Sequence, residues 1–265
     1  MLYSAFQYNY LWLPLFGLIV GLLASMIGSG GGLFFPLILM LLFATPPPVA
    51  VGTSLAAILP LCIVALLGHR NSGNIDVRLG AVFGISGVAG ALAGVGITRL
   101  LGPELLGAAF GAYTMLLGVL MVPARRTPRT QGSGMVTGSL YGFAGGVISG
   151  SFGTSGTAPV LAGLFALRLP LKVVVGTSLL VVLIKTVAAL AGHLLFGKID
   201  LTLVLLLTPG TVLGAFVGPR LLARVDIESQ QGWVRRIFAV IVVLLGLFMM
   251  IRWAGATPGG SLPVY

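Results

Sequence analysis

Long apolar runs, separated by short polar or glycine-rich stretches, fill most of the chain. A run of about 20 apolar residues is long enough for a helix to cross a hydrocarbon core of about 30 Å. Two shorter runs, 33–44 and 157–167, either cross fully or form half-helices paired with the segment before them. The ten predicted segments are 10–28, 33–44, 49–68, 78–100, 104–122, 135–152, 157–167, 172–195, 201–223 and 234–253. The pattern predicts an all-α polytopic membrane protein of eight to ten segments.

Composition supports lipid as the natural solvent of this chain. Of its 265 residues, 57% are hydrophobic and 8% are charged, whereas soluble domains carry about 25% charged residues. The net charge of +10 comes from basic residues in short loops, so we expect no nucleic-acid partner. The lone Cys62 cannot form an intramolecular disulfide, and no ligand spacing indicates a metal or a cofactor. No Lys or Arg precedes the first apolar run, so we expect no cleaved signal peptide.

Basic residues in alternate loops predict the orientation. One set of loops holds eleven Lys and Arg residues and the other holds three. Cytoplasmic loops carry the basic excess, so both termini are expected outside the cell membrane. The polar, basic stretch 123–134 (PARRTPRTQGSG) is then a cytoplasmic linker between a first membrane repeat, 1–122, and a second, 135–265.

The two halves resemble each other at an offset of 124 residues. The sequence VGTSL occurs at 51–55 and again at 175–179. Gly68-His69 likewise matches Gly192-His193, and Asp76 matches Asp200. Each half holds an odd number of segments, so the second half enters the membrane from the opposite side. Such inverted repeats are typical of secondary transporters, which bind their substrate between the halves.

Each half is interrupted by a glycine-rich break that a helix cannot cross cheaply. Irregular backbone at membrane depth must be buried in protein or line a cavity. The helix that restarts after each break presents free N–H groups, which favour an anion. The alternative is that these glycines only allow close helix packing, which is the interpretation we favour for the other spaced glycines, such as Gly90, Gly94, Gly214 and Gly218. The candidate anion-binding residues in the breaks are Gly28, Ser29, Gly30, Gly31, Gly32, Gly153, Thr154, Ser155, Gly156 and Thr157.

The order and duplication of these motifs resemble the TauE/SafE sulfite exporter family, over about residues 14–252. The motifs that carry the resemblance are 28–36 (GSGGGLFFP), 51–55 (VGTSL), Gly68-His69 and 73–76 (GNID), with 176–178 (GTS), Gly192-His193 and 197–200 (GKID) in the second half. The resemblance implies a membrane transporter of sulfite, sulfonates or related organic anions. The family usually has a second glycine-rich run where this chain has Thr154, Ser155 and Thr157. Those hydroxyls could donate to an anion, so the substrate can differ from sulfite.

Other polar residues have a structural and a functional interpretation. Four hydroxyl side chains either contact the substrate or form hydrogen bonds with the local backbone. The two histidines either complement helix ends or couple proton movement, and the two aspartates are helix N-caps or gates. The hydroxyls are Thr53, Ser54, Thr177 and Ser178, and the others are His69, His193, Asp76 and Asp200.

Lys185 is the basic residue within the body of a predicted span, and no acidic residue lies inside any span. A lone ammonium at that depth costs at least about 2.5–3.5 kcal/mol. Its partner is the transported anion, a backbone carbonyl freed at a break, or the membrane surface reached by snorkelling.

The sequence favours an exporter of a small organic or sulfur oxyanion, not an enzyme. Two alternatives are a passive anion channel and, on the pattern of Gly153 to Gly156 with His193, an intramembrane Ser–His protease. We expect a small anion and the lipid bilayer as partners, and the sequence is also compatible with a homodimer.

Overall fold

A computed structural model of the chain describes residues 7–27, 31–70, 74–121, 134–167, 169–196, 199–222 and 231–254. These residues are helical almost throughout and form no strand. The elements are η1 (Tyr8–Trp12), α1 (Leu13–Ile27), α2 (Phe34–Leu41), α3 (Pro47–Arg70), α4 (Val77–Leu100), α5 (Pro103–Met121), α6 (Gly134–Phe152), α7 (Thr157–Ala166), α8 (Leu171–Phe196), α9 (Leu201–Leu222) and α10 (Gln231–Ala254). The ten predicted segments correspond to the ten α-helices.

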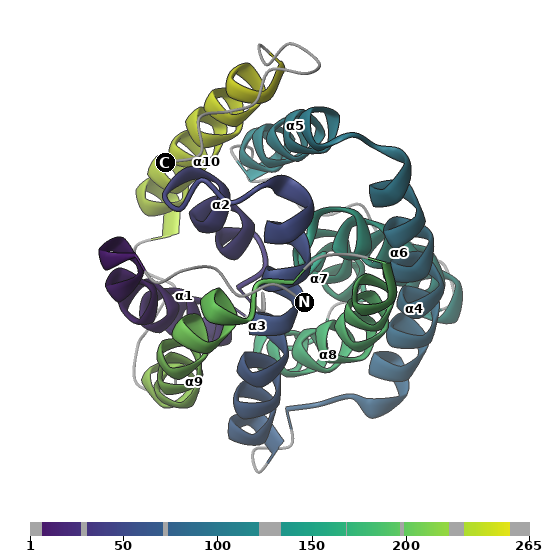
Figure 1. Ribbon diagram of the computed structural model, residues 1–265. Helices are drawn as coiled ribbons and strands as arrows, with labels where there is room; N and C mark the ends of the chain where they lie inside the picture. Colours follow the sequence, from purple (N-terminus) through teal and green to yellow (C-terminus); the bar gives the residue numbers. More distant parts are fainter. Residues whose placement is uncertain are drawn as a thin grey trace. The chain divides into compact units, whose positions relative to one another are not determined.

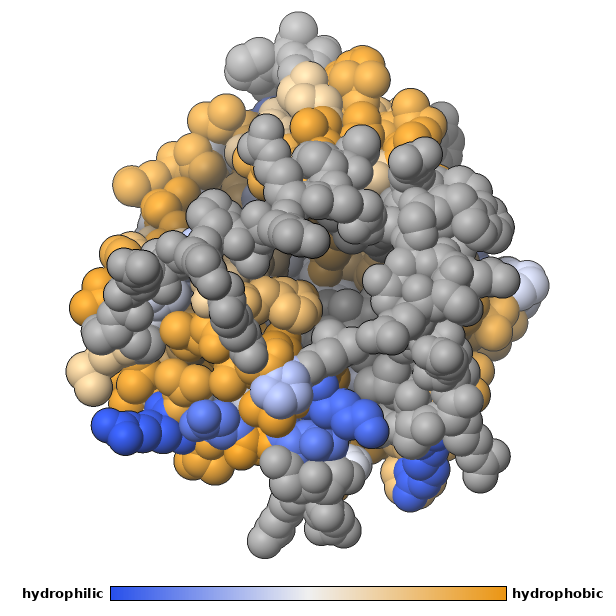
Figure 2. Space-filling model, turned by 180° about the vertical axis from the view of Figure 1, so that it is seen from behind, coloured by the Kyte–Doolittle hydropathy of each residue, from blue (hydrophilic) through white to orange (hydrophobic). Residues whose placement is uncertain are grey.

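Six of the described helices are long and apolar enough to cross a membrane by length and composition. The apolar windows are Tyr8–Ser25, Pro47–His69, Val77–Leu100, Pro103–Leu120, Lys172–Leu195 and Leu201–Gly218. Large apolar side chains such as Ile85 and Leu205 point outward and are about two-thirds exposed, at 70% and 67%. Figure 2 shows hydrophobic residues over most of the coloured surface, with hydrophilic residues gathered toward its lower edge. This surface suits hydrocarbon, and the chain is a multi-pass membrane protein.

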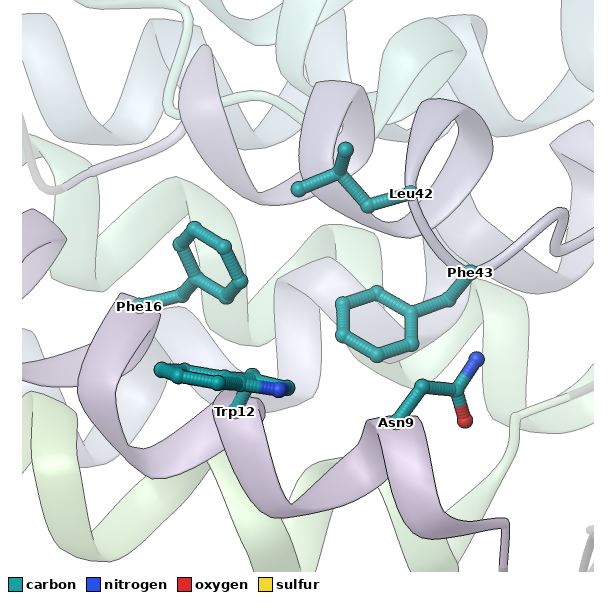
Figure 3. A pocket seen from close by; sticks show the side chains of 5 residues that line it. All are labelled: Asn9, Trp12, Phe16, Leu42 and Phe43. Atoms are coloured by element: carbon teal, nitrogen blue, oxygen red, sulfur yellow. The ribbon is translucent and has the colours of Figure 1, made fainter.

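The two short helices fold back along the helices that precede them. Helix α2 has 8 residues and α7 has 10, which at 1.5 Å per residue is about 12–15 Å, half a membrane. The ring of Phe16, in the first turn of α1, lies 6.4 Å from the ring of Phe43, just after α2 (Figure 3). Gly163 of α7 similarly faces Tyr141 of α6. The structure therefore selects the half-helix interpretation of both segments.

The described residues form two compact units, and each takes helices from both sequence halves. The larger unit is Met1–Thr98 with Thr127–Val225, and the smaller is Arg99–Arg126 with Asp226–Tyr265. Within the larger unit, α1 packs on α9 (Figure 1). Helix α4 packs on α6 in the same unit, where Thr98 donates to the carbonyl oxygens of Gly150 and Ser151. Helices from one half therefore find their neighbours in the other half.

Glycines make these helix contacts close. A Cβ on Gly21 of α1 would overlap the Thr211 backbone of α9, and one on Gly94 would lie 2.8 Å from the Ser151 amide nitrogen of α6. The same small-residue packing joins α5 to α10 in the smaller unit, where a Cβ on Gly111 would lie 2.6 Å from the Met250 amide nitrogen. The packing interpretation of the spaced glycines is confirmed for Gly90, Gly94, Gly214 and Gly218.

Two glycines of α4 offer a matched test of this packing. Gly94 meets α6, whereas a Cβ on Gly96 would meet nothing within 4 Å. Gly94→Ala should lower the free energy of unfolding by about 1–3 kcal/mol, because overpacking displaces the α6 backbone. Gly96→Ala should be neutral or stabilise by up to about 1 kcal/mol, because alanine is the better helix former. Thermal unfolding in detergent measures both, and equal effects at the two positions would refute the contact.

Candidate functional site

The break between α6 and α7 is a buried turn built on two left-handed glycines. Gly153 has φ of 66° and Gly156 has φ of 51°, a region where only glycine is free of strain. The Thr154 hydroxyl accepts a 3.3 Å hydrogen bond from the Gly156 amide. Ser155 and Thr157 share a 2.6 Å hydrogen bond between their hydroxyls. All three predicted hydroxyl side chains of this break are therefore present in one buried cluster.

The break between α1 and α2 lies directly against the second break. A Cβ on Gly32 would overlap the amide nitrogen of Ser155, so the two backbones are in contact. Gly31 adopts φ of 71° and turns the chain into α2. The two breaks therefore meet at Gly32 and Ser155. Gly28, Ser29 and Gly30 lie outside the described residues.

The start of α2 offers less to an anion than the sequence suggested. The Phe34 and Phe35 amides donate to the Gly31 carbonyl at 3.1 and 3.4 Å, and Pro36 has no N–H. These groups are used locally in this conformation. The Phe34 and Phe35 amides are therefore not free for an anion in this conformation, and an anion site at this break stays a prediction.

Lys185 of α8 reaches the second break. Its ammonium is completely buried, with 0% exposure, and donates a 2.8 Å hydrogen bond to the Gly156 carbonyl. A Cβ on Gly145 of α6 would lie 3.0 Å from the Lys185 Nζ, so glycine there gives the ammonium its space. Full burial excludes snorkelling in this conformation. The Gly156 carbonyl is the acceptor for Lys185 within the described part of the chain.

Three buried hydroxyl side chains on α3, α6 and α8 lack a hydrogen-bond partner in the described part of the chain, and the sequence predicted only one of them as a site residue. Ser54, Ser149 and Thr186 have no hydrogen-bond partner among the described residues. Ser54 was a candidate, whereas Ser149 and Thr186 were missed. Ser149 is one helical turn after Gly145, so both share the face of α6 that meets Lys185. Thr186 follows Lys185 in sequence, and its adjacency to the buried lysine is the signal that could have found it.

Thr53 and Thr177 tie the two halves together by equivalent hydrogen bonds. The Asp200 amide donates to the Thr53 hydroxyl at 3.1 Å. In the equivalent contact, the Asp76 amide donates to the Thr177 hydroxyl at 2.9 Å. Each threonine therefore has a partner in the opposite half rather than in its own local backbone. Ser178 bonds the local Val175 carbonyl, as its structural interpretation expects.

Asp76 and Asp200 cap the helices that follow them. The Asp76 carboxylate accepts from the Leu79 amide at 2.9 Å, and the Asp200 carboxylate accepts from the Thr202 and Leu203 amides. The N-cap interpretation of both aspartates is confirmed.

The histidines approach the ends of the helices before the breaks. His193 Nε2 lies 2.8 Å from the Gly150 carbonyl in the last turn of α6. His69 lies near the backbone of Ser25, the equivalent place in α1, although its Nε2 has no hydrogen bond among the described residues. A role at helix ends fits both, and proton coupling stays a prediction.

Two further observations narrow the chemistry. The Ser155 hydroxyl is paired with Thr157 and His193 with Gly150, so no Ser155–His193 dyad exists in this conformation.

A pocket of about 280 Å³ opens at the far end of the α1–α2 hairpin, lined by Asn9, Trp12, Phe16, Leu42 and Phe43 (Figure 3). Its lining is mostly aromatic or aliphatic and carries no charge, so it does not suit an anion.

Comparison with known proteins places these features in a family. The model of the family described as "Sulfite exporter TauE/SafE" matches residues 13–249. The probable membrane transporter protein YdhB of Bacillus subtilis is 30% identical over 76% of this chain and 86% of its own length. A probable membrane transporter protein of Xylella fastidiosa is 28% identical over 90% and 94%, respectively. No solved structure matches the chain.

The paired threonine bonds predict equal effects at equivalent positions. Thr53→Val and Thr177→Val should each lower the free energy of unfolding by about 1–3 kcal/mol, because each leaves a partly buried amide without its acceptor. Thr→Ser at either site keeps the hydroxyl and should retain most of the stability. Thermal unfolding of the four variants tests this; a Val variant as stable as its Ser control would rule out the bond.

Gly32 predicts a steric limit at the contact between the breaks. Gly32→Ala should lower transport strongly, because the methyl group overlaps the Ser155 backbone. Gly32 suits this test better than its neighbour Gly31, because a side chain at φ of 71° would itself strain the backbone and disturb folding. Radiolabelled anion uptake into liposomes measures the loss, with Gly96→Ala as the control. Full transport by Gly32→Ala would show that the breaks can separate freely.

Proposed function

The chain belongs to the sulfite exporter TauE/SafE family, and on that premise we propose that it is a secondary transporter that exports a small organic or sulfur oxyanion. The observation that carries the proposal is the buried Lys185 ammonium beside the second break. It makes one hydrogen bond, to Gly156, among the described residues. An ammonium has three N–H donors, so two remain for a ligand. A buried cation with spare donors is a site for an anion.

The repeats support transport by alternating access. Equivalent residues make equivalent contacts across the halves, as in Thr53 with Asp200 and Thr177 with Asp76. Such reciprocity is expected of two inverted repeats related by a twofold axis in the membrane plane. Substrate sites of inverted-repeat transporters lie between the halves, at discontinuous helices. The burial of Ser155 and Lys185, at 2% and 0% exposure, suits an occluded state between the two open ones.

Charge favours export as the direction. Moving a monovalent anion out of a cell with an inside-negative potential is favourable by about 2.3 kcal/mol per 100 mV. Export therefore requires no coupling ion, whereas uptake does. We place the protein in the cytoplasmic membrane with the central basic linker inside and both termini outside, following the distribution of basic residues.

A counterflow experiment tests the carrier mechanism and the role of Lys185 together. Liposomes loaded with unlabelled methanesulfonate, sulfite or a small carboxylate should accelerate uptake of the same labelled anion, because a carrier returns faster when loaded. A channel shows no such acceleration. Lys185→Met keeps the aliphatic stem and should weaken apparent affinity by at least about tenfold, since it removes a charge-assisted hydrogen bond.

The matched control is Lys172→Met on the same helix, because Lys172 is exposed at the start of α8. It should leave affinity and rate unchanged. Transport by Lys185→Met with wild-type affinity and rate would remove Lys185 from the site.

A further inference from the structure

Among the described residues of the larger unit, no acidic side chain is paired with the Lys185 ammonium. The Asp76 and Asp200 carboxylates are engaged with helix amides at the starts of α4 and α9. Glu104 lies in the first turn of α5, in the other compact unit. The Gly156 carbonyl that faces the ammonium is a neutral dipole. A neutral dipole does not cancel the charge of an ammonium, so the protonated lysine bears a desolvation penalty of several kcal/mol until an anion joins it.

A buried hydroxyl without a partner in the described chain lies one helical turn of α6 beyond the glycine that borders the ammonium, and it points to a ligand. The Ser149 hydroxyl is fully buried and has no partner among the described residues. It shares one face of α6 with Gly145, beside which the Lys185 Nζ lies. An unpaired buried hydroxyl costs about 1–3 kcal/mol. An anion with two or more acceptor oxygens satisfies both the ammonium and the hydroxyl.

We propose that the site takes singly charged oxyanions, with Lys185 as counter-charge and Ser149 as a hydrogen-bond donor, so that the loaded carrier is neutral and the empty carrier is positive. This rests on the proposed transport function and adds the substrate's charge and the step on which the membrane potential acts. A dianion would leave one uncompensated negative charge in the buried site. A monoanion leaves none, so monoanions such as sulfonates are selected over dianions such as sulfate.

Only one half of the transport cycle then moves charge across the membrane. In the loaded half, a neutral site crosses and the membrane potential does no work on it. In the empty half, one positive charge returns inward, which an inside-negative potential drives. Each cycle still moves one negative charge outward, but the electrical work is done on the returning empty carrier. Without the Lys185 charge, the loaded site would be negative and the empty site neutral. The membrane potential would then act on the loaded half of the cycle instead of the empty half.

Exchange under an imposed potential tests directly which half of the cycle moves charge. Liposomes with saturating methanesulfonate on both sides report only the loaded half of the cycle, because no empty carrier needs to return. With valinomycin and a tenfold potassium gradient, wild-type exchange should be unchanged. Exchange through Lys185→Met should depend on the potential, by at most the factor of about ten that one full charge allows. Lys185→Arg should behave as wild type.

Controls separate the alternatives. Cys62→Ala removes a buried thiol and keeps the Lys185 charge, so wild-type behaviour is expected. Ser149→Ala should raise the methanesulfonate concentration for half-maximal exchange by about fivefold or more and leave voltage insensitivity intact. Wild-type exchange that responds to the potential would overturn the proposal, even if Lys185→Met is inactive. Absence of any exchange would instead reject the transport function.

Discussion

The burial of one ammonium group constrains the whole centre of this protein. Lys185 stands on α8 with no exposure and takes the Gly156 carbonyl as its hydrogen-bond partner. Gly156 caps the start of α7 in a left-handed conformation, and this turn in the break between α6 and α7 aims its carbonyl at the ammonium. Gly145 must lack a side chain because a Cβ there would lie 2.6 Å from the Gly156 carbonyl oxygen, and 3.0 Å from the Lys185 Nζ. The helix break, the neighbouring glycine and the lysine therefore depend on one another.

The two breaks contribute differently to the centre of the protein. The second supplies chemistry, through its hydroxyls and the carbonyl bound to Lys185. The first supplies room, because Gly32 allows the Ser155 backbone to approach without a Cβ between them. A sequence that replaced both breaks by glycine would keep the contact but lose the hydroxyls. Thr154, Ser155 and Thr157 thus make the second break the more polar of the two.

Much of the fold followed from the sequence, because apolar run length and glycine spacing are local properties. Helix ends were predicted within a few residues for most elements, and the packing role of Gly94 followed from its spacing. The fold-back of α2 and α7 was left open, since length alone does not say where a short helix turns.

Within the site, the breaks and Lys185 were predicted, but the lysine's partner was not. Ser149 was missed because serine beside glycine in a membrane helix usually marks close packing. The use of Thr53 and Thr177 across the halves was missed as well, because a repeat in the sequence identifies equivalent positions and not the contacts between them.

The interleaving of the halves has a consequence for how the protein is made. Thr53 meets the Asp200 amide, which lies 147 residues later in the chain. At a synthesis rate of about 5–20 residues per second, that partner emerges roughly 7–30 s after Thr53. Helix α1 waits still longer for α9, against which its glycines pack. During that interval the first half resides in the bilayer with its close-packing faces against lipid, so the nascent chain depends on lipid or insertion machinery to shield surfaces that the finished protein hides.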